Sequence, residues 1–453
     1  MASLKDRIGW EQDPKKRGTY TRRPASHEKF FVTMRDFNLA TNIAGCVVVR
    51  STLPNLEERL PYAWRMLRMS CPSIAMTIEH SDDEYYFSYD SNEDFGQWEA
   101  ETFFIHKDVN GEQLYHQLGN VPRAQLHWLE YESKHEFYIK LPHDYMDAIG
   151  LMHLTDVFLD ILSKGDELSL PETGSEVTKL SPPFAVTSGV PQADHGELQE
   201  MVQKIAEDDA EVGCIVPVKD YQNATGAQRL VRVLSKESTV AIIEQTKRHE
   251  LTVSHAFHAA MVLALLKLNP PAGESTKFTP LLPISLRNRL LPQFLGRNNA
   301  VGMYLIAMNI FLTLPVAADY DSEQIISVAK SFKAEYERLQ THPRLTNLSD
   351  PCGDMYQAAL KGPKRPMKLL PFLSSLGVAD QHLRSTYGKE ITVEDFAIRP
   401  DIMGASQLLL WTFGNRMHLS MNYTAGAYDD EFMQAWMKEV IATLESGLEI
   451  KID

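Results

Sequence analysis

The sequence has little that would place it in an oxidising compartment or a membrane. Its 453 residues include four cysteines, Cys46, Cys71, Cys214 and Cys352, and no Cys-x-x-Cys pair, so we expect free thiols. No apolar run approaches the roughly 20 residues of a membrane-spanning helix. Residues 1–23 are charged and polar and lack the apolar stretch of a secretory signal. We therefore expect a cytoplasmic protein.

Positive charge is also scarce, and several catalytic motifs are missing. The 45 Lys and Arg residues are outnumbered by 60 Asp and Glu residues, and the net charge of −15 would repel nucleic acid and anionic membranes. No glycine-rich phosphate loop follows a predicted strand, and there is no Gly-x-Ser-x-Gly or His-Glu-x-x-His motif. His255 and His258 lie three apart on a predicted helix but lack a third ligand. We therefore expect no nucleotide-binding fold, no serine hydrolase and no metal site.

The composition is that of an ordinary globular protein, with 44% hydrophobic and 23% charged residues. Its length predicts about two domains. Residues 165–196 are rich in Pro, Gly, Ser and acidic residues and read as a crossover. We thus predict an N-terminal lobe over residues 1–164, a crossover over 165–196 and a C-terminal lobe over 197–453. Strand and helix patterns alternate in both lobes, which favours an α/β fold with a mixed sheet and flanking helices in each.

Two segments illustrate the pattern. Residues 137–141 alternate as a strand does, and an apolar stripe then predicts a helix from about residue 147 to Gly165, where glycine ends it. Residues 303–314 are nearly all apolar and predict one strand covered on both faces.

The sharpest chemical feature is His143, four residues before Asp147, at the turn between that strand and helix. A hydroxyl is a poor nucleophile until a base removes its proton. With an ordinary pKa of about 6.5, histidine is mostly neutral at cytosolic pH and can take that proton. The aspartate could tie the turn to another part of the protein. The spacing His-x-x-x-Asp alone is common, so its meaning depends on context.

The context resembles one acyltransferase superfamily. Residues 143–150, His-Asp-Tyr-Met-Asp-Ala-Ile-Gly, resemble the HHxxxDG or HxxxD motif of BAHD acyltransferases, peptide-synthetase condensation domains and chloramphenicol acetyltransferase. Residues 176–183, 283–289 and 374–378 resemble further segments of that superfamily in the same order. The likeness is greatest to fungal trichothecene-type O-acyltransferases of secondary metabolism, and it spans nearly the whole chain.

The resemblance implies roles for individual residues. His143 would be the catalytic base, and Asp147 would be structural, paired with Arg287 of the second lobe. The active site would be a tunnel between the lobes of a chloramphenicol-acetyltransferase-like fold. The resemblance further implies that an acyl group, acetyl from acetyl-CoA as co-substrate, would pass directly to a small-molecule alcohol, with no covalent enzyme intermediate and no bound cofactor. The basic residues 361–368 could contact the phosphates of coenzyme A or of a carrier-protein arm.

Three positions depart from the family pattern and leave the oxyanion donor open. Pro142 stands in place of the first histidine of HHxxxDG, and Ala148 in place of the glycine. The DFGWG motif of plant members is reduced to residues 395–400, Asp-Phe-Ala-Ile-Arg-Pro. The candidates to stabilise the oxyanion or bind substrate are Ser374, Ser375 and Asn422.

Three alternatives remain open at this point. The same fold could shape a substrate for cyclisation or pericyclic chemistry. The acyl donor could be a carrier-protein thioester instead of acyl-CoA. The protein could also bind a metabolite without catalysis.

Overall fold

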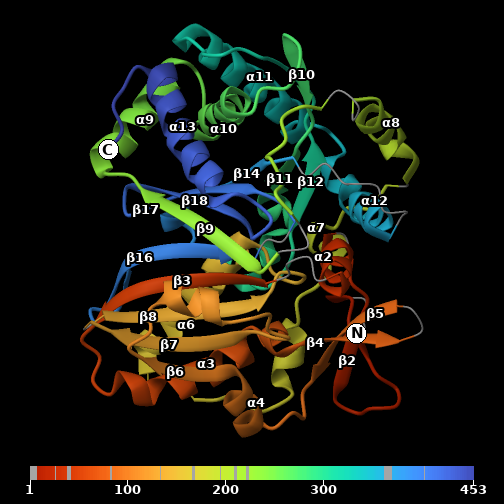
Figure 1. Ribbon diagram of the computed structural model, residues 1–453. Coiled ribbons are helices and arrows are strands. Elements are labelled where there is room, and N and C mark those ends of the chain that lie inside the picture. The colour runs from red at the N-terminus through yellow and green to blue at the C-terminus, as the bar shows by residue number, and fades with distance from the viewer. Residues whose placement is uncertain are drawn as a thin grey trace.

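The chain folds into two α/β lobes that lie against each other along a broad interface (Figure 1). The computed structural model describes residues 8–25, 27–37, 42–81, 84–132, 134–165, 169–193, 195–208, 212–220, 224–361, 370–401 and 404–453. One lobe is built on a six-stranded sheet and the other on a four-stranded sheet, each with helices packed on it. This is the two-lobed arrangement of mixed sheets that the sequence predicts.

The six-stranded sheet of the first lobe has the order β15-β16-β3-β8-β7-β6. Helix α6 packs on β3, where Leu151 lies against Gly45. A small sheet of order β1-β2-β5-β4 lies beside it. The strands are β1 (Glu11–Gln12), β2 (Thr19–Arg22), β3 (Asn42–Ser51), β4 (Thr77–Ser81), β5 (Glu84–Asp90), β6 (Phe103–Lys107), β7 (Gln125–Tyr131), β8 (Lys134–Pro142), β15 (Thr386–Tyr387) and β16 (Ile391–Pro400). The helices are α2 (His27–Asp36), α3 (Leu56–Ser70), α4 (Phe95–Thr102), α5 (Gly111–Gln117) and α6 (Ala148–Lys164).

Two of these strands come from the last third of the chain. β16 pairs antiparallel with β3 over its whole length, from Ile391 opposite Ser51 to Pro400 opposite Ile43. β15 continues the sheet on the far side of β16. Residues 386–400, which fall in the range predicted for the C-terminal lobe, therefore complete the sheet of the first lobe.

The second lobe is built on a sheet of order β14-β17-β18-β9, with two two-stranded sheets, β10-β13 and β11-β12, beside it. The strands are β9 (Gly226–Val233), β10 (Ser275–Phe278), β11 (Leu281–Ser285), β12 (Leu305–Asn309), β13 (Leu312–Pro315), β14 (Phe372–Val378), β17 (Gln407–Phe413) and β18 (Arg416–Ala425). The helices are α7 (Phe184–Ser188), α8 (Gln199–Asp208), α9 (Lys236–Arg248), α10 (Val253–Leu268), α11 (Ser322–Gln340), α12 (Ser349–Lys361) and α13 (Asp430–Leu448).

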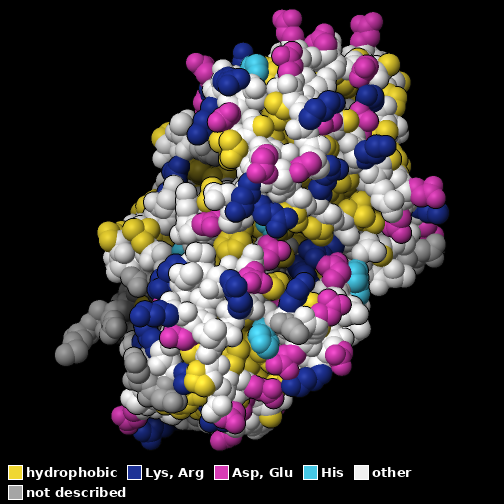
Figure 2. Space-filling view, turned by 90° about the vertical axis from the view of Figure 1, so that its left-hand side faces the viewer, with side chains coloured by type: hydrophobic (Ala, Val, Ile, Leu, Met, Phe, Trp, Pro, Cys, Tyr) yellow, Lys and Arg dark blue, Asp and Glu magenta, His cyan; other side chains and the backbone are white. Residues whose placement is uncertain are grey.

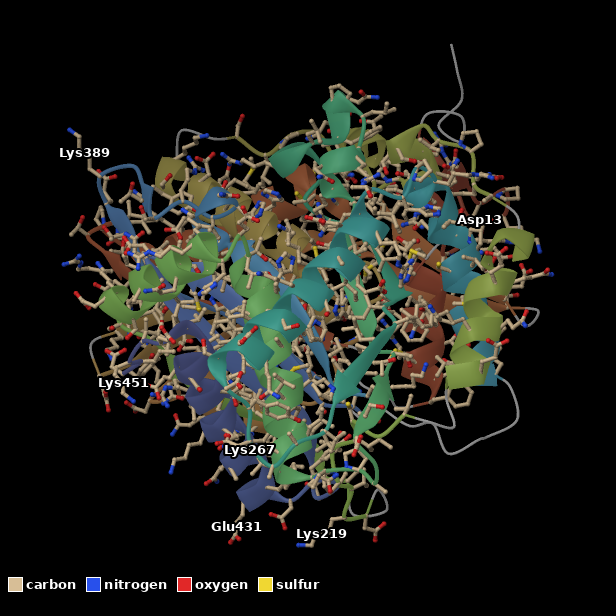
Figure 3. The ribbon with its side chains drawn as sticks, turned by 90° about the horizontal axis from the view of Figure 1, so that it is seen from above. Asp13, Lys219, Lys267, Lys389, Glu431 and Lys451 are labelled. Carbon is tan, nitrogen blue, oxygen red and sulfur yellow. The ribbon has the colours of Figure 1, made fainter. Side chains whose placement is uncertain are left out.

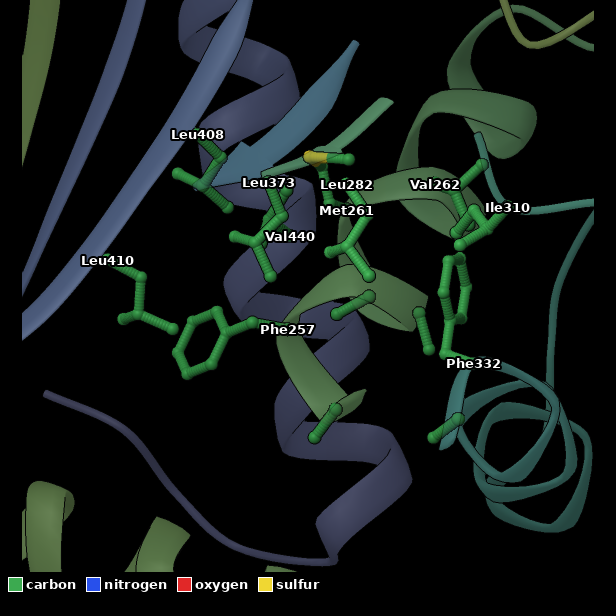
Figure 4. Packing of buried hydrophobic residues seen from close by; sticks show 14 of the residues in the cluster. Phe257, Met261, Val262, Leu282, Ile310, Phe332, Leu373, Leu408, Leu410 and Val440 are labelled. Carbon is green, nitrogen blue, oxygen red and sulfur yellow. The ribbon is translucent and has the colours of Figure 1, made fainter. Parts of the chain in front are cut away.

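The core of the second lobe forms around α10, which is apolar on every side and buried (Figure 4). A helix without a polar face is stable only when it is surrounded by other elements. Phe257 points toward Leu410 of β17, and Val262 lies beside Phe332 of α11. No single described helix is long and apolar enough to span a membrane; α9 and α10 reach that length only together, across a 96° bend.

Acidic and basic side chains alternate over the face in Figure 2. Seen from above in Figure 3, the labelled charged residues Lys389 and Glu431 lie at the rim of the molecule.

The predicted single strand over residues 303–314 is wrong, because the structure divides it. β12 pairs with β11, and β13 pairs with β10, in two separate sheets. Pro280 lies between β10 and β11 and has no N–H to continue a ladder. The partner strand breaks opposite it, where the Ile310 N–H donates to the Pro280 carbonyl at 3.2 Å.

Candidate active site

His143 lies in the short turn between β8, which ends at Pro142, and α6, which begins at Ala148. Its Nδ1 is 2.7 Å from the carbonyl oxygen of Met146. Only a protonated Nδ1 can donate to a carbonyl, so Nε2 carries the lone pair. Within the described part of the chain, Nε2 has no hydrogen-bond partner. The ring is half-buried, and its tautomer is the one that a general base requires.

The electrostatic setting keeps this imidazole neutral. Burial lowers the pKa of His143 below its ordinary value of 6.5. The Met146 carbonyl and the Asp147 carboxylate raise it in part, but burial has the larger effect. A neutral imidazole at neutral pH can accept a proton, which is the property that catalysis by a base requires.

The aspartate of the motif, Asp147, is the N-cap of α6 and is buried. Its Oδ1 accepts the Gly150 N–H at 2.7 Å, and its Oδ2 accepts the Tyr304 N–H at 2.9 Å. The Nε of Arg287 lies 2.9 Å from Oδ1 and 3.0 Å from Oδ2. The carboxylate therefore fixes the start of α6 and does not reach toward the imidazole of His143.

Arg287 begins the short 3-10 helix Arg287–Arg289 of the second lobe. Its remaining N–H groups donate to backbone carbonyls. Nη1 donates to Asn299, and Nη2 donates to Ala300 and Gly302, all within 3.0 Å. Only Nε of Arg287 faces Asp147, so the guanidinium does not bind the carboxylate through two parallel N–H groups. The result is a buried ion pair that ties the turn carrying His143 in one lobe to two loops of the other.

Helix α2 covers the other side of the catalytic turn. The Phe31 ring lies over the His143 imidazole, with centroids 4.5 Å apart and planes 32° apart. Arg35, one turn later, pairs with the Asp144 carboxylate. Asp144 is fully buried, and its Oδ1 has no hydrogen-bond partner among the residues that the structure describes. Burial raises the pKa of its carboxyl to about 7, although Arg35 acts to lower it.

Sequence reasoning missed Phe31, Arg35, Asp144 and Tyr304. Asp144 stands beside His143 in the sequence, so its position alone could have drawn attention. No local pattern could have brought α2, more than a hundred residues earlier, against His143.

The three oxyanion candidates occupy two faces of the β14-β17-β18-β9 sheet. Ser374 pairs with Leu409 in parallel register, and Asn422 pairs with Gln407, two residues earlier on the same strand. Paired residues share a face, and Leu409 packs in the core of the first lobe. Ser374 and Asn422 therefore face the interface between the lobes.

Ser375 points to the opposite face, where its Oγ is 2.8 Å from the Ser254 Oγ at the start of α10. Asn422 is fully buried and already bonded to Ser420, through Oδ1 at 3.0 Å and Nδ2 at 2.9 Å. Ser374 is half-buried and has no side-chain hydrogen bond within the described residues. Of the three, Ser374 is the one whose side chain combines the interface position with a free hydroxyl.

Residues 395–400, compared above with the DFGWG motif, form the C-terminal part of β16 and contact strands of the second lobe. Asp395 lies 3.6 Å from His418 of β18. The Phe396 carbonyl accepts the Trp411 Nε1–H at 3.1 Å. These contacts give the segment a structural role at the interface.

The remaining predicted features are the two histidines of α10 and the basic segment 361–368. His255 belongs to the capping box of α10, and His258 is buried beside the Tyr336 hydroxyl at 3.0 Å. No group of three or more His, Cys, Asp or Glu side chains with metal-binding geometry occurs in the part of the chain that the structure describes. Apart from Lys361, the basic segment 361–368 lies outside the described residues.

No model of a known protein family matches the chain. Among curated proteins it is 24% identical over 402 residues to O-acetyltransferase pigM of Monascus ruber, covering 86% of this chain and 76% of that protein. It is 23% identical over 326 residues to azaphilone biosynthesis cluster protein M of Aspergillus terreus, covering 69% of this chain and 77% of that one.

Solved structures resemble the chain over nearly its full length. The trichothecene 15-O-acetyltransferase TRI3 of Fusarium sporotrichioides aligns with a TM-score of 0.82 at 16% identity, over 97% of this chain and 98% of that one. The first condensation domain of the calcium-dependent antibiotic synthetase aligns with a TM-score of 0.66 at 10% identity, over 94% and 96%. The chain thus has the two-lobed fold of the chloramphenicol acetyltransferases and condensation domains.

Proposed function

We propose that this protein is an acyl-CoA-dependent O-acyltransferase that acylates a hydroxyl of a small fungal-type secondary metabolite, with His143 as the general base. The observation that carries the proposal is the state of that imidazole. Its Nδ1–H is fixed to the Met146 carbonyl, and its Nε2 lone pair has no partner among the described residues. The similarity to fungal O-acetyltransferases supports acyl transfer as the chemistry and acetyl as the group.

The proposed reaction is a direct transfer. Nε2 of His143 takes the proton of the acceptor hydroxyl as its oxygen attacks the thioester carbonyl. The tetrahedral intermediate collapses, its C–S bond breaks, and the imidazolium returns the proton to the leaving thiolate of coenzyme A. The acyl group leaves on the acceptor oxygen, and the protein ends in its starting state. Ser374 is the candidate donor to the oxyanion.

The test compares His143→Ala with the wild type. Loss of general-base help should lower kcat roughly 10²–10⁴-fold, and the protein should remain folded because the half-buried ring loses only one hydrogen bond and its contact with Phe31. In the wild type, kcat/KM should fall at acidic pH with a midpoint below 6.5, because burial lowers the pKa of His143 and protonation removes the base. Product masses from acetyl-CoA and a panel of alcohols report the transfer itself.

The same assay separates the alternatives. Saturable turnover with free acetyl-CoA counts against a carrier-protein donor. Conversion of a substrate without any thioester, or a bound metabolite with no dependence on His143, would contradict the proposal.

A further inference from the structure

Helix α2 is fastened to the second lobe at three points and can therefore support the turn that carries His143. Lys29 pairs with Asp354 of α12 at 2.5 Å. His27 Nε2 accepts the Ala307 N–H of β12 at 3.0 Å. Thr33 accepts a hydrogen bond from Gln357 of α12 at 2.9 Å. A helix anchored at three points along its length can hold a neighbouring side chain in one place.

Two residues of α2 meet the catalytic turn, and they lie one helical turn apart on the same face. Phe31 covers a face of the His143 ring, and Arg35 pairs with Asp144, the next residue after His143. One contact therefore holds the imidazole, and the other holds the backbone that carries it.

The imidazole has two independent constraints. The bond from Nδ1 to Met146 fixes which edge of the ring points into the turn. It still allows the ring to tilt about that bond. The Phe31 ring, at a centroid distance of 4.5 Å, blocks the tilt toward α2 and covers that side of the imidazole. Together they restrict the directions in which Nε2 can point.

We propose that Phe31 is a positioning residue for acyl transfer, whose ring holds the His143 imidazole at the angle from which Nε2 meets the acceptor hydroxyl. The proposal rests on the proposed function of His143. Phe31 forms no bond with the reacting atoms and acts only through the imidazole. By keeping water from one face of the ring, it also helps to maintain the neutral base.

The charged groups around His143 do not supply this effect. Asp147, on its own turn, favours the protonated imidazole. On α2, Arg35 is paired with Asp144 and Glu28 is paired with Arg22. The loss of the Phe31 ring would leave these pairs in place, so a change in His143 would report the ring.

The experiment compares Phe31→Ala, Phe31→Leu and Phe31→Tyr in the full chain, with Phe37→Ala as the matched control. Phe37 follows the same helix but is 46% exposed. The chain is labelled at histidine Cε1, and the His143 NMR signal is assigned by its loss in His143→Asn. The pH midpoint of this signal can be measured without any enzymatic activity. The signals of the other histidines show whether each variant is folded.

Phe31→Ala should raise the His143 midpoint toward 6.5 because water reaches the imidazole. It should lower kcat roughly 10- to 100-fold, as expected for a misplaced catalytic group, with little change in KM for acetyl-CoA. Phe31→Leu should lower kcat although leucine still fills the space. Phe31→Tyr retains the aromatic ring and should have a kcat close to that of the wild type. Phe37→Ala should match the wild type.

An unchanged midpoint in folded Phe31→Ala, or a wild-type kcat in Phe31→Leu, would overturn the proposal. If even the wild type transfers no acetyl group, the proposed function fails, and the proposal about Phe31 fails with it. In that case the midpoint still reports whether the ring shields the imidazole.

Discussion

The ion pair between Asp147 and Arg287 should be the most sensitive point of the fold, and Arg287→Met tests this. Both side chains are 8% exposed. The substitution keeps an unbranched apolar stem, but it leaves the carboxylate with no counter-charge and removes the Nη donors to the Asn299, Ala300 and Gly302 carbonyls. Breaking a buried pair by removing one partner costs about 3–5 kcal/mol.

This free energy can be converted into a melting temperature. An unfolding entropy of about 2.1 cal/mol/K per residue over 453 residues makes 1 kcal/mol worth about 1 °C. Differential scanning calorimetry should therefore show Arg287→Met melting about 3–5 °C below the wild type, with lower soluble yield and activity. The control is Lys107→Met, whose ion pairs with Glu57 and Glu130 are exposed, and which should melt like the wild type.

A double variant tests whether Arg287 compensates the charge of the Asp147 carboxylate. In the Arg287→Met background, Asp147→Asn removes the uncompensated charge, so the double variant should be more stable than Arg287→Met alone. If the two losses simply add, the carboxylate is not held by Arg287, and the reasoning about the pair is wrong.

Two further predictions concern the same turn. The pKa of Asp144 is raised to about 7 from an ordinary 3.8, so its burial favours the protonated form, and the stability it contributes is lost as pH rises from about 4 through 7. Asp144→Asn should flatten that decline when melting temperatures are compared at pH 5 and 7.5, and an unaltered slope would show that Asp144 does not titrate in this range. Gly150→Ala should lower the melting temperature although alanine favours helices by about 1 kcal/mol, because its Cβ would lie 2.3 Å from Arg287 Nη2 and 2.5 Å from the Ala300 carbonyl. The control Gly96→Ala, in α4, meets only the Asp94 side chain at 3.2 Å and should be neutral, and equal melting of both variants would contradict this.

Features set by local sequence could be predicted, and those set by distant contacts could not. The start of α6 is encoded by Asp147 as an N-cap and its end by Gly165, so its bounds follow from the sequence. The turn at Gly414 and Asn415 between β17 and β18 is likewise local, since both residues have positive φ of 57° and 62°.

Only part of the site could be predicted from the sequence. The turn carrying His143 could be found from five consecutive residues, and Arg287 from a resemblance in a separate segment. The Phe31 ring, the break of residues 303–314 opposite Pro280, and the return of β16 to β3 depend on pairings across large sequence distances. Apolar periodicity says that such surfaces are buried but not what covers them.

The return of β16 to the first lobe has a consequence for any attempt to divide the protein. A fragment that stops after the crossover would lack the neighbour of β3 and expose a ten-residue apolar edge open to aggregation. The remaining fragment would carry β16 with no sheet to join. Co-expression of two halves should therefore succeed only when the cut leaves residues 386–400 free to reach β3.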